Sequence, residues 1–477
     1  MKELYDCLSA HVARFFIEIS AIPRPSGGET RIAAYLEDFS AKRGLDYYRD
    51  AADNVLIRKN GTPGREAEAP LLLQAHSDMV TEVAFGRTHD FSKDGVSLRM
   101  VNGVLCADGT TLGADDGYGM ALMLAVLDGG ADSHPPLECL FTASEEIGLI
   151  GAGKFDYGRI RARRMLNLDS AEEHLVINGC CGGIRSALRL PVTRVAAKGE
   201  GLRVTLSGLC GGHSGEDIHR GRANALVTMG AVLKRLEKLT PFALVSICGG
   251  DKTNAIPRDC VVTLLPKSMA AATAFFADAE SVLSSLPFAA EDGKRSLTAE
   301  PVAVEHVMSD ADRGRIMEVL SIRNGILVYR NGAEGQPETS RNLANVRTEE
   351  GQVCFRLSSR SPFDGRLQES CAELDALAKS VGGLATHDSY YPGWEGDESS
   401  AVSALWQKCY REITGREIFV KALHAGLECG LISSRLPGLD VISVGCNIYD
   451  LHTPVERMEP DSLERIYQTL IAFLQEC

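Results

Sequence analysis

The chain has 477 residues, a formal net charge of −14 and 44% hydrophobic residues, a balance typical of globular proteins. A chain of this length is too long to fold around one ordinary hydrophobic core, so we expect two or three domains. The negative charge, without a basic patch, excludes nucleic acid as an expected partner, and no apolar run is long enough to span a membrane.

The N-terminal segment and the cysteines indicate the compartment. The segment MKELYDCLSAHVARFFIEIS is amphipathic and carries acids, so it lacks the apolar stretch of a signal peptide. The 14 cysteines are scattered, and none forms a CxxC motif. This pattern predicts reduced thiols in a cytoplasmic protein.

Hydrophobic periodicity predicts an α/β domain at both ends of the chain. In chain order, the expected elements are a helix near 3–19, a helix near 28–43, strands near 46–58, a strand at 71–75, a helix from about 116 to Gly129–Gly130, strands at 137–143, 164–168 and 440–448, and a last helix from about Asp461. Short apolar strands alternating with helices are typical of a doubly wound, mostly parallel sheet.

Between these α/β segments the pattern changes. Stretches such as GLRVTLSG, RDCVVTLLP and QVCFRLSSR alternate apolar and polar residues and are separated by amphipathic helices. They predict an α+β insert, an antiparallel sheet with helices on one face, in which a strand–helix–strand–strand–helix unit occurs twice. The expected domains are 1–187 (catalytic, first segment), 188–388 (inserted lid) and 389–477 (catalytic, second segment).

Histidine and carboxylate side chains gather where the predicted α/β strands end. They are His76, Asp78, Glu145, Glu146, Asp169 and His452, with Asp115 and Asp116 at the start of a helix. Each one alone could be a buried histidine, a helix cap or a turn residue. Together, at the edge of a sheet where ligands bind, two histidines and three carboxylates suit Zn²⁺, Mn²⁺ or Co²⁺, and suffice for two ions that share one carboxylate.

The motifs resemble those of the co-catalytic zinc metallopeptidases that include the aminoacylases, carboxypeptidase G and aminotripeptidase. They are, in order, HSD, GADDG, SEEIG, NLDS, GGHSG, TNAIP and LHTP. LGADDGYGMA, FTASEEIGLIGA, YPGW and HAGLECGL are similar to the subgroup of aminoacyl-histidine, or cytosol non-specific, dipeptidases. The resemblance covers essentially the whole chain. It implies an α/β catalytic domain with an inserted lid, a homodimer, and hydrolysis of dipeptides, including Xaa-His dipeptides.

The resemblance also implies a ligand set for two zinc ions, with Mn²⁺ or Co²⁺ as alternatives. His76, Glu146 and Asp115 are expected to hold one ion, while Asp169, His452 and Asp115 complete the pair, with Asp115 bridging. The assignment of each terminal ligand to an ion stays open. Because Asp116 follows directly, the identity of the bridging aspartate stays open as well.

Three further residues are expected to take part in catalysis. The resemblance makes Glu145 the general base, which takes a proton from the water activated by the two zinc ions. Asp78, two residues after His76 on an extended segment, is expected to orient that imidazole. His213 resembles the lid histidine that stabilises the oxyanion. In relatives with a single lid module, the corresponding histidine comes from the partner subunit. This insert of about 200 residues has room for two modules, so His213 is expected to serve its own chain.

The remaining candidates are substrate-binding residues. Asn254 and Arg360 resemble groups that hold the substrate backbone and its free carboxylate, although Arg360 could also be a surface charge. His424 and Gly426 resemble a loop that lines the substrate pocket. For Glu428, contact with the substrate ammonium and a structural role both stay open.

Two alternative functions stay open. An amidohydrolase of the same fold would act on N-acyl amino acids and would need no free N-terminus. A catalytically silent, metal-binding relative would have no need of a base, and the intact Glu145 argues against it.

Overall fold

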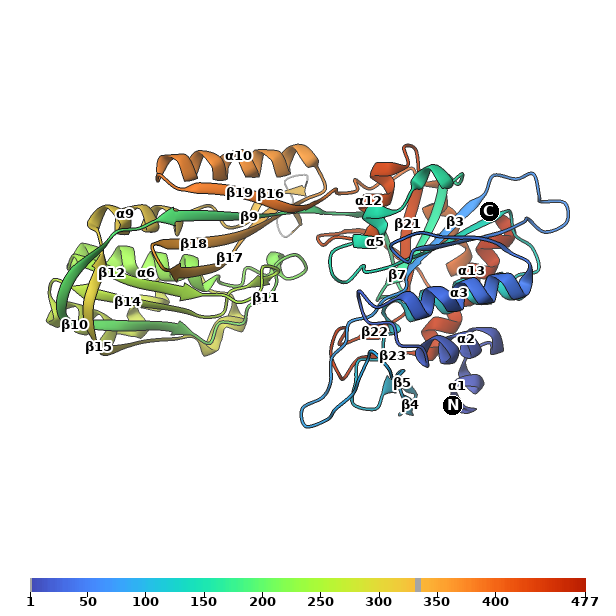
Figure 1. The fold of residues 1–477 in the computed structure, drawn as a ribbon, viewed down its shortest axis with the longest axis horizontal. Coiled ribbons are helices and arrows are strands. Elements are labelled where there is room, and N and C mark those ends of the chain that lie inside the picture. Colours follow the sequence, from blue (N-terminus) through green and yellow to red (C-terminus); the bar gives the residue numbers. More distant parts are fainter. Residues whose placement is uncertain (1, 331–335) are drawn as a thin grey trace. The chain divides into compact units, whose positions relative to one another are not determined.

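The computed structural model describes residues 2–330 and 336–477. The chain forms two compact units (Figure 1). The first, here called the α/β unit, comprises Met1–Cys180, Trp394–Leu423 and Leu427–Cys477. The second, the insert unit, comprises Cys181–Gly393 and His424–Gly426. Within the described ranges, no helix is long and apolar enough to cross a membrane.

The α/β unit is built on an eight-stranded sheet. In spatial order its strands are β1 (Asp46–Arg49), β2 (Val55–Lys59), β6 (Leu137–Thr142), β3 (Leu71–His76), β7 (Arg164–Ser170), β21 (Asp440–Gly445), β8 (Leu175–Cys180) and β20 (Phe419–Leu423). The central strands β6, β3, β7 and β21 run parallel to one another, whereas β2 joins β6 and β8 joins β21 in antiparallel fashion. The predicted mostly parallel sheet is confirmed.

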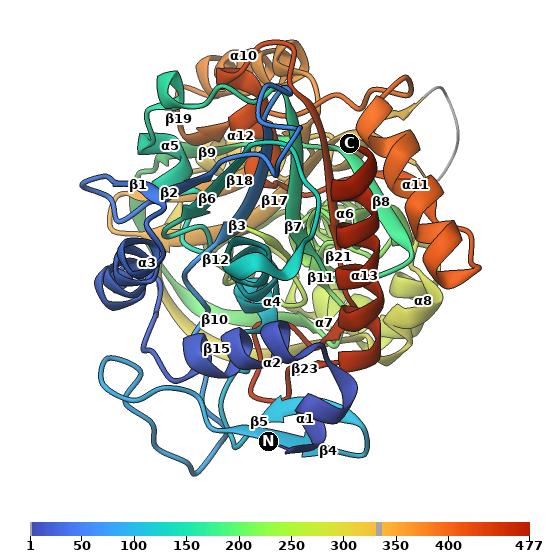
Figure 2. The same ribbon diagram turned by 90° about the vertical axis from the view of Figure 1, so that its right-hand side faces the viewer.

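Helices cover both faces of this sheet, as a doubly wound fold requires (Figure 2). One face carries α2 (Ala10–Ser20), α3 (Thr30–Arg43), α4 (Ala114–Ala125), α11 (Ala401–Thr414) and α13 (Pro460–Glu476), whose buried side chains share one apolar cluster. The other face carries α5 (Ile150–Lys154) and α12 (Glu428–Arg435). At the end of α4, a π-turn at Val126–Gly130 leads towards β6.

The prediction of one helix over 3–19 is wrong, because the segment forms α1 (Lys2–Cys7) and α2. Ser9 separates the two helices in an extended conformation, with φ −51° and ψ 136°. Its N–H and its hydroxyl both donate to the carboxylate of Glu464 at 2.7 Å. Serine is favoured just before the start of a helix, where its side chain can form hydrogen bonds that replace those of the helix backbone. The break therefore falls at Ser9, whose N–H and hydroxyl bind Glu464.

A small four-stranded sheet was not predicted. It joins β22 (Ile448–Tyr449), β23 (Arg457–Met458), β5 (Val104–Ala107) and β4 (Leu98–Val101), in that order. Strands β22 and β23 pair with each other and so close the loop 450–456 between them. This hairpin fixes both ends of the loop that carries His452.

The insert unit contains an antiparallel sheet of nine strands, as predicted. Its spatial order is β15 (Ser296–Met308), β10 (Arg194–Ser207), β14 (Cys260–Pro266), β12 (Phe242–Gly249), β17 (Pro337–Glu349), β18 (Gln352–Ser361), β9 (Gly182–Pro191) and β19 (Leu384–Tyr391), with β16 (Gly325–Tyr329) beside β17. The main helices are α6 (Ala225–Leu239), α7 (Met269–Ala277), α8 (Ala279–Ser284), α9 (Asp310–Val319) and α10 (Asp364–Ser380). Buried side chains of α6, α7, α9 and α10 join one apolar cluster with the sheet.

The predicted repeat is visible in the order of these elements. The first half runs β10–α6–β12–β14–α7, and the second runs β15–α9–β17–β18–α10, with β16 added between α9 and β17. A separate two-stranded ribbon, β11 (Gly212–His213) with β13 (Ala255–Ile256), belongs to the first half. The two halves lie side by side in one sheet because β12 pairs with β17.

Candidate active site

The four central strands of the α/β unit place ligand-type side chains at one edge of the sheet. His76 is the last residue of β3, and Asp169 lies at the end of β7. Glu146 follows β6, and His452 follows β21 in the hairpin loop. Because these strands are adjacent and parallel, their carboxyl ends meet at the edge where ligands bind in such folds.

Asp115, at the start of α4, lies between the two histidines. Its Oδ1 is 2.9 Å from Nε2 of His76, and its Oδ2 is 3.2 Å from Nε2 of His452. Nε2 of His452 is also 2.9 Å from Oε1 of Glu146, while Nε2 of His76 is 3.7 Å from Oδ1 of Asp169. The structure therefore brings the other four predicted metal-binding residues together around the carboxylate of Asp115.

The neighbouring Asp116 is held differently. Its fully buried carboxylate accepts hydrogen bonds from the backbone N–H groups of His76 and Gly119, both at 3.1 Å. These bonds fix it to the backbone, whereas both oxygens of Asp115 face imidazole nitrogens. Of the two aspartates, Asp115 has the geometry of a bridging group.

The structure leaves more than one pairing of the terminal residues. His76 and Glu146, which were expected on the same ion, belong to one group with Glu145, while Glu146 also lies against His452 in a group with Asp115. His76 also lies near Asp169. The approach of His452 to Glu146 depends on the loop after β21, and the strand order alone does not reveal it.

Asp78 lies behind His76 and has a wider role than predicted. Its Oδ1 is 3.4 Å from Nδ1 of His76, as the spacing suggests. Its two oxygens also accept the backbone N–H groups of Glu145 (2.9 Å) and Glu146 (3.3 Å). One fully buried carboxylate thus connects the end of β3 to the loop that carries both glutamates.

The electrostatics of the cluster suit a cation. Burial raises the pKa of Asp169 and that of Glu145 well above their usual range, because these acids share a dry site with other carboxylates. Burial opposes charge on His452, but hydrogen bonds to Asp115 and Glu146 outweigh it and raise the pKa of His452 to about 11. So many acids in one place favour proton uptake or a bound cation.

The donor set passes a further test of fit to a divalent metal. Three overlapping groups place ligand atoms within 4.8 Å of one another: His76, Asp116 and Asp169; His76, Glu145 and Glu146; Asp115, Glu146 and His452. Imidazole nitrogens with carboxylate oxygens are the donors that zinc takes in catalytic sites.

In the insert unit, three predicted residues converge on Gly215. A Cβ atom at this glycine would lie 2.3 Å from the carbonyl oxygen of His424, 3.2 Å from Cε1 of His213 and 3.3 Å from Nε of Arg360. Only glycine permits this approach. The structure therefore gathers His213, Arg360 and the His424 loop within one unit, although they are far apart in sequence.

Arg360 is a buried residue of β18, so its interpretation as a surface charge is wrong. Its Nη1 donates to the hydroxyl of Tyr391 at 2.9 Å, while its Nε is buried without a hydrogen bond among the described residues. Gly426 lies beside the same tyrosine, since a Cβ there would be 2.7 Å from the ring. Tyr391 had not been predicted; its place in the YYPGW motif was the available signal.

His213 and Asn254 lie on neighbouring segments of the β11–β13 ribbon. Nδ1 of His213 accepts the backbone N–H of Glu216 at 3.2 Å, which leaves the ring proton on Nε2. The N–H of Ser214 donates to the carbonyl of Asn254 at 2.8 Å, and the side chain of Asn254 is exposed. The ribbon thus keeps these two candidates together.

His424 uses both ring nitrogens inside the insert unit. Nδ1 is 3.1 Å from Sγ of Cys181, and Nε2 is 2.7 Å from Oγ of Ser340. Burial and the nearby Arg360 lower the pKa of His424 to about 3, so the ring is neutral. These bonds fix the loop 424–426. Because both ring nitrogens have partners, this loop would contact a substrate through its backbone.

Glu428 is fully buried in the α/β unit, at the start of α12. Its Oε2 accepts hydrogen bonds from Nε2 of Gln74 and from the hydroxyl of Thr142, both at 2.6 Å. Burial raises the pKa of the Glu428 carboxyl to about 7. Of the two open interpretations, this environment fits the structural one.

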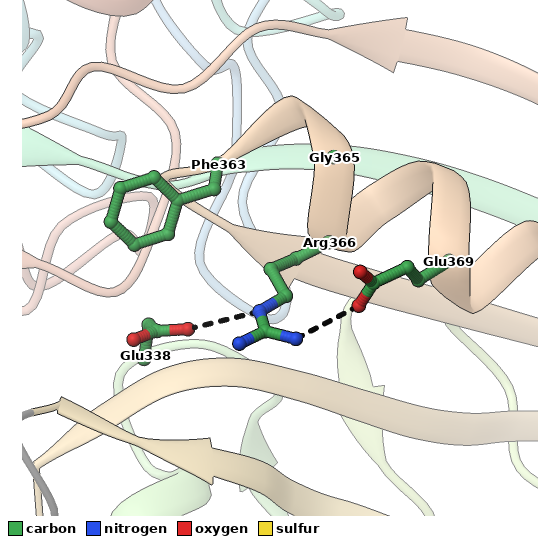
Figure 3. A pocket seen from close by; sticks show the side chains of 5 residues that line it. All are labelled: Glu338, Phe363, Gly365, Arg366 and Glu369. Atoms are coloured by element: carbon green, nitrogen blue, oxygen red, sulfur yellow. Dashed lines mark hydrogen bonds and ion pairs between the residues drawn. The ribbon is translucent and has the colours of Figure 1, made fainter.

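A hollow of about 430 Å³ lies elsewhere in the insert unit (Figure 3). It is lined by Glu338, Phe363, Gly365, Arg366 and Glu369. The guanidinium of Arg366 lies 3.5 Å from Glu338 and 2.9 Å from Glu369, so these charges satisfy one another. The hollow contains none of the predicted site residues.

Comparisons with known proteins show which proteins this chain is similar to. Residues 204–270 match the family model described as the M20 peptidase dimerisation domain. The whole chain is 34% identical to the cytosol non-specific dipeptidase of Escherichia coli K12, of which it covers 99%. The crystal structure of aminoacylhistidine dipeptidase from Vibrio alginolyticus superposes with a TM-score of 0.87 at 36% identity, over 98% of this chain and 97% of that one.

A more distant structure shares the fold. An M20 family metallo-carboxypeptidase from Sulfolobus solfataricus superposes with a TM-score of 0.56 at 14% identity, over 98% of this chain and 99% of that one. Both units of the chain thus have counterparts in a known architecture.

Proposed function

The chain belongs to the M20 peptidase family, and from this premise we propose that it is a metal-dependent dipeptidase that cleaves Xaa-His and other dipeptides. The observation that carries the proposal is the meeting of four ligand-type side chains around a fifth, Asp115, next to Glu145. The names of two relatives that match over nearly the whole chain support dipeptides as the substrate class.

We assign the ligands to two zinc ions that share Asp115, with Mn²⁺ or Co²⁺ as alternatives. His76 and Asp169 would complete one site, and Glu146 and His452 would complete the other, as their proximity favours. When bound, the ions lower the pKa of water and polarise the substrate carbonyl. Asp78 holds His76 in place and sets the direction of the loop that carries the glutamates.

Glu145 is the group that moves the proton. It stands next to the ligand Glu146 and keeps partial access to solvent. Burial raises the pKa of its carboxyl, so it is able to accept a proton from the attacking water and later deliver it to the leaving amine. A carboxylate with an ordinary pKa would hold that proton less readily.

The candidates of the insert unit are assigned to the substrate. Arg360, with its unpaired buried Nε, suits the free carboxylate of a dipeptide by bidentate geometry. His213, with its ring proton on Nε2, suits the developing oxyanion. Asn254 and the backbone at Gly426 would hold the substrate main chain. We keep 1–187, 188–388 and 389–477 as the proposed domain boundaries.

The assembly and the compartment are proposed from the relatives and the thiols. The match to a dimerisation domain supports a homodimer. No disulfide joins any of the 14 cysteines, all of which lie in the described ranges, and one relative is named a cytosol enzyme. Both observations support a cytoplasmic enzyme.

A substrate comparison tests the proposal. Purified protein should hydrolyse Ala-His and β-Ala-His, lose this activity after treatment with a chelator and regain it when zinc is restored. N-acetyl amino acids should be poor substrates. Preferential cleavage of N-acetyl amino acids would instead indicate the amidohydrolase, and inactivity on all substrates with metal bound would indicate a silent relative.

A further inference from the structure

Two buried side chains of opposite charge hold the backbone next to Asp115, and neither belongs to the set predicted from the sequence. Arg24 is 2% exposed and lies between α2 and α3. Glu456 is 3% exposed and lies in the β22–β23 hairpin, four residues after His452. Buried charges are costly unless they are fully bonded, so their partners indicate their purpose.

Glu456 binds the start of α4. Its Oε2 accepts the N–H groups of Leu112 (2.9 Å) and Gly113 (3.1 Å), and its Oε1 accepts those of Ala114 (2.9 Å) and Asp115 (3.5 Å). These donors have no partner within the helix, and a carboxylate at this end also complements the helix dipole. The loop that carries His452 is thereby tied to the segment that carries Asp115.

Arg24 binds carbonyl groups on the other side of the same segment. Its Nη2 donates to the carbonyl of Gly113 at 2.5 Å. Its Nη1 donates to the carbonyls of Asp78 at 2.8 Å and Ser77 at 3.3 Å, which directly follow His76. Close packing accompanies these bonds, since a Cβ at Gly117 would lie 2.7 Å from Nη2.

The two side chains together connect three ligand-bearing segments. Arg24 connects the segment after His76 to the Asp115 segment, and Glu456 connects the Asp115 segment to the loop of His452. We propose that Arg24 and Glu456 are positioning residues that set Asp115 between His76 and His452, and so allow both metal positions to share it. This inference rests on the proposed metal centre.

The conformation of His452 shows why such a connection is needed. His452 has φ +60°, a left-handed conformation that is unfavourable for a residue with a side chain. Residues in such conformations persist when surrounding contacts fix them. Glu456 supplies a contact of this kind, because its carboxylate anchors the hairpin while Nε2 of His452 faces Asp115 and Glu146.

Zinc titration separates this role from a general contribution to stability. The test variant is Glu456→Gln, which keeps the shape but removes the charge and one pair of acceptor sites. The matched control is Glu138→Gln, because Glu138 is 3% exposed in the same unit and accepts the N–H groups of Arg161 and Ala162, both at 2.9 Å, outside the ligand segments. Metal-free proteins are titrated with Zn²⁺ by calorimetry, and their thermal unfolding is measured in parallel.

The two variants should lose similar thermal stability without metal, but differ in metal binding. Glu456→Gln should bind the second equivalent of zinc about 10- to 100-fold more weakly, the range seen when a group supporting a metal ligand is removed. Glu138→Gln should bind both equivalents as the unmodified protein does. With excess zinc, kcat of Glu456→Gln should fall while KM stays unchanged, because the substrate contacts are intact.

Equal zinc binding by Glu456→Gln and the unmodified protein would overturn the inference. Failure of the unmodified protein to bind two equivalents would overturn the proposed metal centre, and this inference with it. If Glu456→Gln does not fold, Arg24→Lys gives the same comparison: it keeps the charge but cannot reach both the Gly113 and Asp78 carbonyls with a rigid fork. Unaltered zinc binding by Arg24→Lys would also overturn the inference.

Discussion

Each oxygen of the Asp115 carboxylate faces a different histidine, and the other candidate ligands are arranged around this carboxylate. His76 comes from β3 and His452 from the β22–β23 hairpin, so a single residue joins two distant parts of the chain. The next residue, Asp116, is bound to backbone N–H groups and has no such freedom. Two adjacent and chemically identical side chains thus make different contacts because their surroundings differ.

Glu428 gives a prediction about pH. Burial raises the pKa of its carboxyl from the ordinary 4.5 to about 7. Between these two pH values, the folded protein keeps a proton on Glu428 that the unfolded chain releases. The stabilisation from this proton is fully present below pH 4.5 and is lost as pH rises through 7. For the metal-free protein, this loss should amount to about 2–3 kcal/mol of unfolding free energy between pH 5 and pH 8.

The variant Glu428→Gln provides the comparison, because its amide does not titrate. Both tryptophans, Trp394 and Trp406, lie in the α/β unit, so tryptophan fluorescence during denaturation reports on this unit alone. The unmodified protein should lose more stability than Glu428→Gln across this pH range. Parallel pH profiles would show that the Glu428 carboxyl does not hold the proton.

The contact between Asp78 and His76 was predictable because the two residues share an extended segment, where alternate side chains point the same way. The bonds from Asp78 to the N–H groups of Glu145 and Glu146 were not, nor were those made by Arg24 and Glu456. Nearly every residue has the same backbone N–H and C=O groups, so the sequence does not indicate which of them a side chain will bind. These bonds also join segments that only the fold brings together. Residue-level prediction therefore named the candidate ligands and Asp78, and it missed Arg24 and Glu456, which bind the backbone beside those ligands.

Among the elements, long apolar patterns were the most predictable. The strand at 71–75 appears as β3, and the helix expected from about 116 appears as α4. The small sheet escaped prediction because β22 and β23 have only two residues each, too few for a pattern. The break at Ser9 depends on Glu464, which is remote in sequence.

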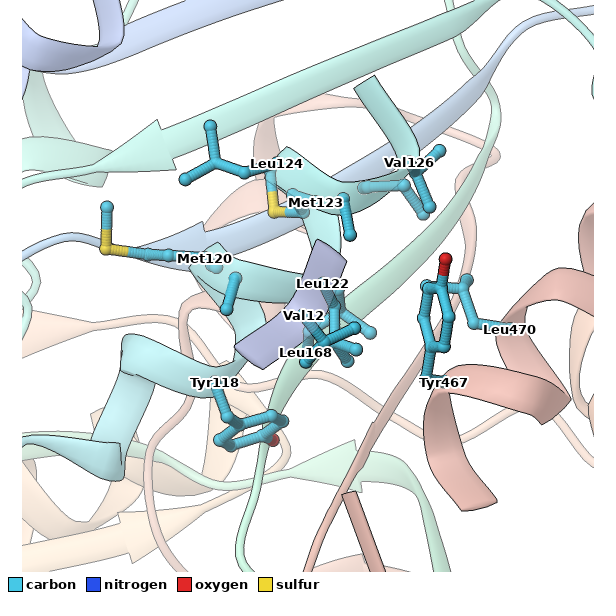
Figure 4. Close-up of a cluster of buried hydrophobic side chains, with 14 of the residues drawn as sticks. Val12, Tyr118, Met120, Leu122, Met123, Leu124, Val126, Leu168, Tyr467 and Leu470 are labelled. Carbon is cyan, nitrogen blue, oxygen red and sulfur yellow. The ribbon is translucent and has the colours of Figure 1, made fainter. Parts of the chain in front are cut away.

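Helix α4 supports Asp115 through its packing. Its middle turns are buried on all sides, and Leu122 lies near Val12 and Leu168 in one apolar cluster (Figure 4). Truncation of this fully buried side chain in Leu122→Ala should reduce the unfolding free energy of the α/β unit by about 2–5 kcal/mol. Denaturant unfolding followed by tryptophan fluorescence measures the change.

The control for α4 is Ile413→Ala on α11 in the same unit. Ile413 is 43% exposed, so its truncation should cost about 0.5 kcal/mol or less. Similar losses in the two variants would contradict the packing described for α4.

At the scale of the whole molecule, the doubled strand–helix pattern of the insert unit has a functional consequence. Residues 204–270, which match a peptidase dimerisation domain, form part of the first half only. A second half of the same design is present in the same chain, so we expect His213 to act on the metal centre of its own chain. Dimerisation would then be architectural.

Mixing two inactive variants, His213→Ala and Glu145→Gln, tests this expectation. If the histidine acts within its own chain, no combination of the variants restores an intact site, and the mixture stays inactive. Recovery towards activity at about a quarter of the sites, the share expected for random mixed dimers, would show action across subunits. A tagged chain must first show that subunits exchange.

The most direct test of the account measures zinc content and dipeptide turnover together in Glu145→Gln, with Glu146→Ala beside it. Glu145 is proposed to move the proton without binding metal, whereas Glu146 is proposed to bind it. Glu145→Gln should retain two zinc ions per chain and lose turnover by about 10²- to 10⁴-fold or more, because the amide cannot accept the proton of the water. Substantial activity in Glu145→Gln, or a loss of zinc as large as that in Glu146→Ala, would contradict the account.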